Sequence, residues 1–198
     1  STLYAQGNID EIYNRIEINE KLDSDNKDVA AFSAFISNKE KRKTANKFCN
    51  NPLDFVKFSN ISLHLKNSSS YITKVIEELH NVKKIWEPLN LATIKGFQSG
   101  NNLFRDPPQK LSKLRSIILN ELDLYRLKFK DETCDLIKEL NDMNNKKIMY
   151  AWYVILKKQG YQNAHIHRSA LLSGVIYLKT VPSHGKNEGA IEFNLNGV

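Results

Sequence analysis

The chain has 198 residues, of which 41% are hydrophobic and 26% are charged, and glycine and proline are scarce. This composition excludes disorder throughout, and no apolar run reaches the roughly 18–20 residues that a bilayer-spanning helix needs. The net charge of +7 comes from lysines scattered among acidic residues, which indicates a solvated basic surface and argues against nucleic acid as a partner.

The termini and the cysteines bear on where the protein acts. No charged and then apolar leader opens the sequence, so we expect a cytoplasmic protein without a membrane partner. Cys49 and Cys134 form no C-x-x-C pair, and we expect both to be free thiols. Because the chain starts without methionine and stops at Val198, directly after an apolar alternating segment, we expect a fragment that is truncated at its C-terminus.

Residues 1–47 are expected to form a helical segment. Apolar side chains recur at helical spacing in two stretches, which the polar turn of residues 23–28 joins. The stripe residues are Ile9, Ile12, Tyr13 and Ile16 in the first stretch and Val29, Phe32 and Ile36 in the second. The end of a tetratricopeptide-like repeat has this pattern, although one helix pair does not establish a repeat.

The middle of the chain predicts one short strand and two longer helices. Alternating apolar residues indicate a strand over residues 60–66. A helix is expected after the N-cap candidates of residues 67–70, with Trp86 on its apolar side and Pro88 at its end. A strongly amphipathic helix is expected over about residues 109–129.

Short strands are expected in the last third of the chain. Residues 148–156, 171–178 and 190–195 are rich in β-branched and aromatic side chains, and turn-like segments separate them. Strands this close together favour an antiparallel sheet, sandwich or barrel over βαβ units. The predicted fold class is therefore α+β, with helices first and strands second.

Two histidines in this region point to a metal. On a strand, residues two apart lie on one face, so His165 and His167 would present their imidazoles side by side while Ile166 packs the other way. Two imidazoles so placed can share an iron, zinc, copper or nickel ion. The alternative is a pair of partly exposed strand histidines without a ligand.

A metal site needs further ligands, and an oxygenase iron takes two histidines and one carboxylate. No H-x-D or H-x-E occurs in the chain. The candidates for a third ligand are His184, Glu188 and Glu192, each of which could equally be a solvent-exposed side chain.

The C-terminal third resembles a known family. Residues 151–167, 172–178 and 189–193 resemble the progression G-W-x-V-x-L, G-Y-Q-x-x-H-x-H, S-G-V-Y-Y and G-x-I-x-F, with Ala151 in place of the first glycine and Ile176 in place of a tyrosine. This progression is typical of the iron(II)/2-oxoglutarate oxygenase family whose members often carry tetratricopeptide repeats upstream. Residues 48–52 and 95–104 also resemble landmarks of that family.

The resemblance implies a double-stranded β-helix, or jelly roll, whose N-terminal part would occupy residues 48–198. It implies Fe(II) as the metal and 2-oxoglutarate as the cosubstrate of a dioxygenase. His165 matches the first ligand of the motif, and His167 matches the position where the wider superfamily has a carboxylate. Arg168 departs from the family, which often has proline there.

Other parts of the implied site are less directly matched. Ser173 and Tyr177 share a face of the expected strand and could hydrogen-bond 2-oxoglutarate, or could simply pack there. The distal histidine of the family and the basic residue that binds the 2-oxoglutarate carboxylate are expected beyond Val198. We therefore expect the fragment alone to be inactive.

Two other functions remain open on the sequence. A cupin-like metal-binding protein without 2-oxoglutarate would also suit the H-x-H spacing. A non-catalytic helical-repeat module, which binds another protein through residues 1–47, would suit the helix pair and the basic surface. The substrate is unknown under the oxygenase reading, and a protein is one candidate.

Overall fold

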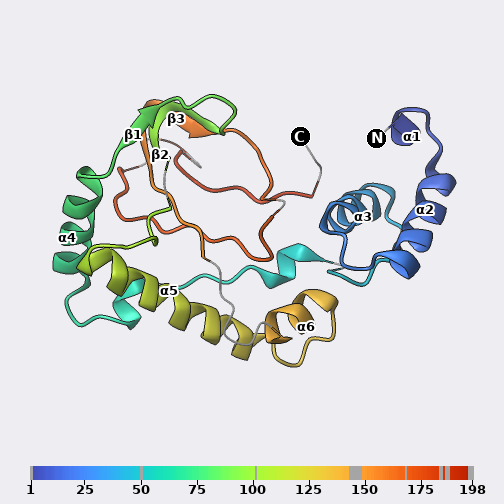
Figure 1. The fold of residues 1–198 in the computed structure, drawn as a ribbon. Coiled ribbons are helices and arrows are strands. Elements are labelled where there is room, and N and C mark those ends of the chain that lie inside the picture. The colour runs from blue at the N-terminus through green and yellow to red at the C-terminus, as the bar shows by residue number, and fades with distance from the viewer. Residues whose placement is uncertain are drawn as a thin grey trace.

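The structure is a computed structural model that describes residues 2–49, 51–100, 102–142, 149–167, 169–182, 185 and 188–195. Within these ranges six α-helices accompany a three-stranded antiparallel sheet in the order β1-β2-β3 (Figure 1). The α+β class is therefore confirmed. None of the described helices combines the length and the apolar character needed to cross a bilayer.

The N-terminal helices are α1 (Thr2–Ala5), α2 (Ile9–Leu22) and α3 (Lys27–Glu40). The expected helix pair is thus present, and the side chain of Asn26 caps α3 by accepting a hydrogen bond from the Val29 amide at 3.1 Å. The pair has its own small apolar cluster, formed by the buried residues Ile12, Tyr13, Ile16 and Ile36.

The segment after α3 departs from the sequence-based expectation. It forms two short 3-10 helices, η1 (Pro52–Phe55) and η2 (Ile61–Leu63), so the predicted strand over residues 60–66 is wrong. The side chain of Asn60 accepts a hydrogen bond from the Ser62 amide at 2.9 Å. This local bond competes with an extended conformation and favours the turn.

The next helix, α4, spans Ser68–His80 and ends earlier than expected. The expected end at Pro88 is wrong, because the amide of Asn81 already bonds back to the carbonyls of the last turn. Trp86 instead belongs to strand β1 (Lys84–Trp86). There the Trp86 ring packs edge-on against Phe97 of the neighbouring strand, with ring centroids 5.0 Å apart.

Strands β2 (Thr93–Ser99) and β3 (Val154–Gln162) pair antiparallel, and β1 pairs with the other edge of β2. Of the expected strand over residues 148–156, β3 contains only residues 154–156, and it continues through residues 157–161, which were expected to form a turn. β2 was not expected from its glycine- and amide-rich sequence.

Two glycines allow the strands to approach at an irregularity in this pairing. Ile94 faces Tyr161 and Gly96 faces Leu156, so β3 carries extra residues opposite Lys95. A Cβ on Gly96 would lie 2.8 Å from the Ile155 carbonyl oxygen, and one on Gly160 would lie 2.5 Å from the carbonyl oxygen of Lys95. Neither position has room for a side chain.

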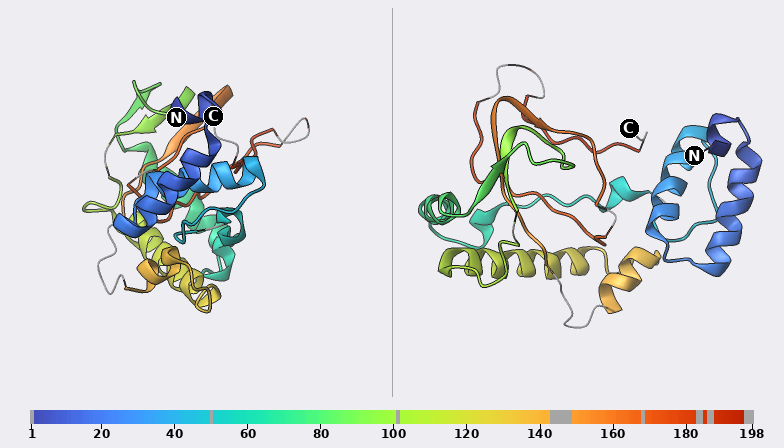
Figure 2. Two further views of the ribbon diagram at one scale, coloured as in Figure 1. Left: turned by 90° about the vertical axis from the view of Figure 1, so that its right-hand side faces the viewer. Right: turned by 45° about the horizontal axis from the view of Figure 1, so that its top comes forward.

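Helices α5 (Gln109–Lys128) and α6 (Asp135–Asp142) complete the regular structure. α5 matches the expected amphipathic helix and runs beneath the sheet, with α4 at one end and α2 and α3 beyond the other (Figures 1 and 2). A buried apolar cluster joins α4, α5 and the residue before β3: Tyr71, Val75, Leu79, Leu111, Leu114, Ile117 and Tyr153.

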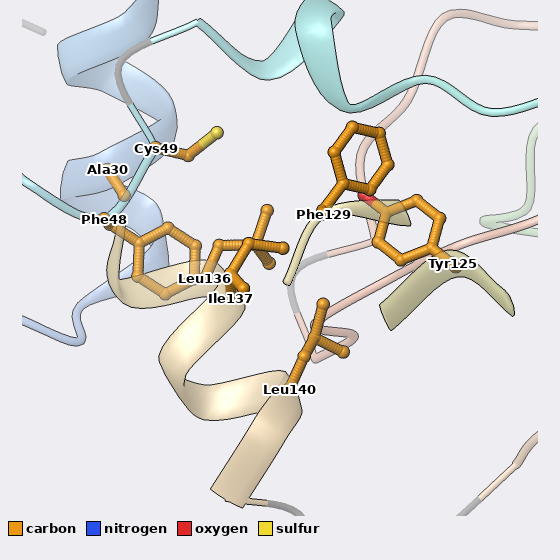
Figure 3. Close-up of a cluster of buried hydrophobic side chains, with 8 residues drawn as sticks. All are labelled: Ala30, Phe48, Cys49, Tyr125, Phe129, Leu136, Ile137 and Leu140. Atoms are coloured by element: carbon orange, nitrogen blue, oxygen red, sulfur yellow. The ribbon is translucent and has the colours of Figure 1, made fainter. Parts of the chain in front are cut away.

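A second buried cluster joins α3 to α5 and α6 (Figure 3). Its members are Ala30, Phe48, Cys49, Tyr125, Phe129, Leu136, Ile137 and Leu140. Cys134 packs against this cluster, and both cysteines are free thiols, as expected. Ala30 and Phe48 lie on opposite sides of the expected domain boundary between residues 47 and 48, and they share this core. The boundary stays a prediction.

The C-terminal part differs most from expectation. Among the described residues, 171–178 and 190–195 form no strand, so a complete double-stranded β-helix is not observed. The apolar side chains of Val175, Tyr177 and Phe193 are more than half exposed. β-branched and aromatic residues favour a pleated, half-buried surface, but a strand also needs a neighbour for its backbone groups, and no ladder partner pairs with these segments here.

Candidate metal centre

The two histidines of the H-x-H motif follow directly after β3. The amide of Asn163 donates to the carbonyl of Ala92 at 2.8 Å, which extends the pairing with β2 by one residue. Residues 165–167 have no regular secondary structure, so the expected placement of these histidines on a strand is wrong. The chain leaves the sheet just before them.

His165 and His167 nevertheless lie side by side, and we call them the histidine pair. Their Nε2 atoms are 3.0 Å apart and their ring centroids 4.9 Å apart. Nδ1 of His165 lies 2.7 Å from the carbonyl oxygen of Asn163. Because a carbonyl can only accept, His165 carries its proton on Nδ1 and its Nε2 lone pair points at His167.

The separation of the Nε2 atoms fits two ligands of one metal ion. Bonds from a metal to imidazole nitrogen are about 2.0–2.1 Å long, and two such bonds at a right angle place the nitrogens about 2.9 Å apart. Adjacent positions of an octahedral iron site have this angle. The hydrogen bond from Nδ1 to a backbone carbonyl is also the usual way in which a metal-binding histidine is oriented.

The indole of Trp152 covers one face of His167. The two rings are stacked, with centroids 5.3 Å apart and planes inclined by 17°. Burial lowers the pKa of His167, and the nearby His165 lowers it further. The neutral imidazole, which is the form that binds metals, is therefore favoured at this residue.

The backbone beside Trp152 is fixed to the end of β2. The amide of Tyr153 donates to the hydroxyl of Ser99 at 3.0 Å, and the Ser99 amide donates to the Tyr153 carbonyl at 3.0 Å. The side-chain oxygen of Asn102 accepts from the Ala151 amide at 3.1 Å. These bonds hold Trp152 in place, and thereby the surface against which His167 rests.

Residues 150–195 match the family model described as "Putative 2OG-Fe(II) oxygenase". This match supports the family that the sequence resembles, and the matched segment contains both the histidine pair and Trp152. No curated protein matches the chain, and no solved structure does.

A row of polar side chains fixes the C-terminal end of β3, which lies just before the histidine pair. The hydroxyl of Thr93 donates to Oε1 of Gln98 at 2.6 Å and accepts from Nε2 of Gln162 at 2.6 Å. Thr93 and Gln98 are buried. Gln98 therefore helps to orient β3 through Thr93.

The remaining residues predicted for the oxygenase site do not join the histidine pair in this structure. Ser173 and Tyr177 are exposed, and within the described ranges neither hydrogen-bonds to the pair. Among the described residues no three His, Cys, Asp or Glu side chains lie close enough to hold a metal, so Glu188 and Glu192 do not complete the site. His184 lies outside the described residues.

The histidine pair is also more open than expected. His165 is exposed and His167 is half-buried, so the described residues do not enclose the pair in a pocket. Trp152 is the contact that sequence reasoning did not assign to the site. Its place in the family-like progression was visible, but its stacking on His167 depends on the chain turning back after β3.

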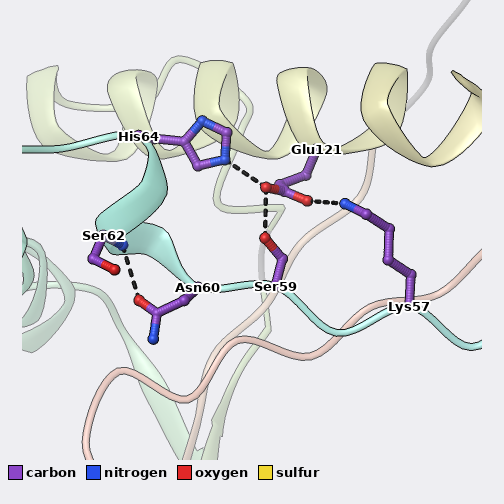
Figure 4. A network of polar contacts seen from close by, with 6 residues as sticks. All are labelled: Lys57, Ser59, Asn60, Ser62, His64 and Glu121. Carbon is purple, nitrogen blue, oxygen red and sulfur yellow. Dashed lines mark hydrogen bonds and ion pairs between the residues drawn. The ribbon is translucent and has the colours of Figure 1, made fainter. Parts of the chain in front are cut away.

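A separate polar network, which the sequence did not predict, surrounds Glu121 on α5 (Figure 4). Its carboxylate accepts from the Lys57 ammonium and from the Ser59 hydroxyl at 2.6 Å, and Nε2 of His64 lies 2.5 Å from Oε1. Burial raises the pKa of Glu121, but these hydrogen bonds outweigh burial and hold the pKa at about 2.

The geometry of the Glu121 network indicates a structural role. Ser59 and His64 both contact the same carboxylate oxygen, so the imidazole does not bridge an acid and a hydroxyl as a nucleophilic triad requires. The network attaches residues 57–64 to α5.

Proposed function

We propose that this protein is an Fe(II)/2-oxoglutarate-dependent oxygenase in which His165 and His167 supply two of the metal ligands. The observation that carries the proposal is the 3.0 Å separation of the two Nε2 atoms within the segment that matches the oxygenase family model. When bound, Fe(II) and 2-oxoglutarate would supply the oxidising chemistry, with oxygen consumed and succinate and carbon dioxide released.

The residues around the histidine pair would prepare it for the metal. The bond from Nδ1 of His165 to the Asn163 carbonyl fixes the tautomer and leaves the Nε2 lone pair free to coordinate. Trp152 fixes the plane of the His167 ring and excludes water from one face of it. Because the Nε2 lone pair of His165 accepts at 3.0 Å, the neutral His167 donates from Nε2 in this arrangement, and its proton would have to sit on Nδ1 for Nε2 to coordinate.

The hydroxyls of Ser173 and Tyr177 are proposed to hydrogen-bond 2-oxoglutarate. Both residues belong to the matched segment, and both are exposed, which leaves their hydroxyls available to a ligand. Uncharged hydroxyl donors of this kind orient a carboxylate without adding a second charge beside the metal.

The test is turnover of 2-oxoglutarate uncoupled from a substrate. The protein is incubated in air with Fe(II), ascorbate and 2-oxoglutarate, and succinate is measured by mass spectrometry. We expect no succinate from residues 1–198 alone, and succinate from the full-length protein and from its His80→Ala variant, which changes an exposed histidine on α4, but none from its double variant His165→Ala/His167→Ala.

Two outcomes would reject the oxygenase proposal. Metal binding at the histidine pair without any binding of 2-oxoglutarate by calorimetry would support a cupin-like metal-binding protein instead. If the protein binds neither a metal nor 2-oxoglutarate, and the double variant still binds its partner, the result would support a helical interaction module.

A further inference from the structure

A pocket of about 210 Å³ lies far along the chain from the histidine pair, between α3 and the segment that follows it. Ser33 and Ser37 line it from one face of the helix. Lys43, Thr44 and Asn46 line it from the segment that follows. We call this cavity the Ser33 pocket.

Two polar groups of the Ser33 pocket are buried without a partner. Ser33 and Asn46 are each only 3% exposed. The Oδ1 atom of Asn46 accepts from the Phe48 amide at 3.2 Å. Within the described chain, however, the Nδ2 group of Asn46 has no acceptor and the Ser33 hydroxyl has no hydrogen-bond partner. Buried polar groups are nearly always satisfied by protein, water or a ligand.

The chemistry of the lining favours an anion. The unpaired Nδ2 group of Asn46 can only donate, and the Ser33, Ser37 and Thr44 hydroxyls can each donate as well. Lys43 adds a positive charge, and no acidic side chain is among the residues that line the pocket. The C-terminal carbonyls of α3 oppose an anion, but Lys43 offsets their partial charge.

We propose that the Ser33 pocket binds a small oxyanion, either inorganic phosphate or the carboxylate of a small acid. The ligand would accept hydrogen bonds from Ser33 and Asn46, which are otherwise buried and unpaired, and an ion pair from Lys43. This site is distinct from the histidine pair and goes beyond the proposed oxygenase function.

Thermal unfolding of the protein tests this proposal in two arms, with phosphate or acetate at constant ionic strength. We expect a saturable rise of the melting temperature in at least one arm, and the arm that responds identifies the kind of oxyanion. Asn46→Asp keeps the acceptor for the Phe48 amide but replaces the donor with a negative charge. Ser33→Ala and Lys43→Gln remove a single donor each.

Each of these three variants should lower the affinity for the anion at least about ten-fold, because hydrogen bonds to a charged group are stronger than those between neutral groups. Lys41→Gln, on a neighbouring exposed lysine outside the lining, should leave the affinity unchanged. Ser33→Ala should unfold no earlier than the parent without ligand, since its hydroxyl has no partner to lose. It therefore remains informative if Asn46→Asp fails to fold.

Two results would overturn the proposal. One is the absence of saturable stabilisation by either anion, which would mean that the pocket holds only water. The other is equal stabilisation of the parent, Ser33→Ala and Lys43→Gln, which would mean that the anion binds elsewhere.

Discussion

The indole of Trp152 lies flat against the imidazole of His167, with 5.3 Å between the ring centroids. These residues are held by different parts of the fold, because Trp152 precedes β3 and His167 follows it. A fluorescent side chain is thereby placed in contact with a proposed metal ligand, which makes the site open to direct spectroscopic tests.

Trp152 fluorescence should report metal binding. The chain has two tryptophans, so in Trp86→Phe all indole emission comes from Trp152. Titration of this variant with Co²⁺ or Ni²⁺ should quench the emission saturably, because an open-shell ion would sit beside the stacked ring. Trp152→Phe, which retains Trp86, should show no such quenching. Equal responses of the two variants would contradict the assignment of the metal to this site.

Gly96→Ala should destabilise the protein by about 1–3 kcal/mol, because the new Cβ would lie 2.8 Å from a backbone oxygen that cannot move alone. Urea unfolding measures the change. Gly174→Ala is the control, since a Cβ there meets nothing within 4 Å, and it should be neutral or slightly stabilising. An equal loss of stability in Gly96→Ala and Gly174→Ala would show that β2 and β3 are not as close as described.

Glu121→Gln should lower the free energy of unfolding by about 1–3 kcal/mol at neutral pH, because it removes the charge that Lys57 and Ser59 bind. The pKa of Glu121 is lowered from 4.5 to about 2 on folding. Its contribution to stability is therefore complete above pH 4.5 and is lost as the pH falls through about 2.

Stability curves of the parent and of Glu121→Gln should consequently converge as the pH falls from 4.5 toward 2. Urea unfolding over this range provides the measurement. A constant difference between the two proteins at all pH values would mean that the charge of Glu121 contributes nothing.

Ile137→Ala should cost about 2–5 kcal/mol, because Ile137 is 1% exposed in the cluster that joins α3, α5 and α6. Leu22→Ala, at a position that is 81% exposed, should change the stability by less than about 0.5 kcal/mol. Denaturant unfolding compares the two variants. A small effect at Ile137 would mean that the helices do not share this core.

The local spacing of apolar residues was sufficient to predict the longest helices. The apolar stripe of α5 repeats every three or four residues over several turns, and its buried positions Leu111 and Leu114 lie on that stripe. By contrast β2 contains Gly96 and the polar side chains of Thr93 and Gln98, which do not mark a strand in the sequence. Their mutual hydrogen bond and their pairing with β3 depend on residues far along the chain.

The proximity of the histidines could be anticipated from a spacing of two, but the reason for it could not. His165 and His167 meet in an irregular segment, where the bond from His165 to the Asn163 carbonyl orients the first ring. Trp152 orients the second ring from the other end of β3. No local pattern encodes that contact, because it exists only after the chain has turned back from the sheet.

The most direct test of the metal centre is a binding measurement that does not depend on turnover. Calorimetric titration of the protein with Co²⁺, as a stand-in for Fe(II), should show one ion per chain. His165→Ala and His167→Ala should each weaken binding by at least about 100-fold, while His80→Ala should bind as the parent does. Unchanged binding in both single variants, or no binding by the parent, would contradict the assignment of His165 and His167 as metal ligands.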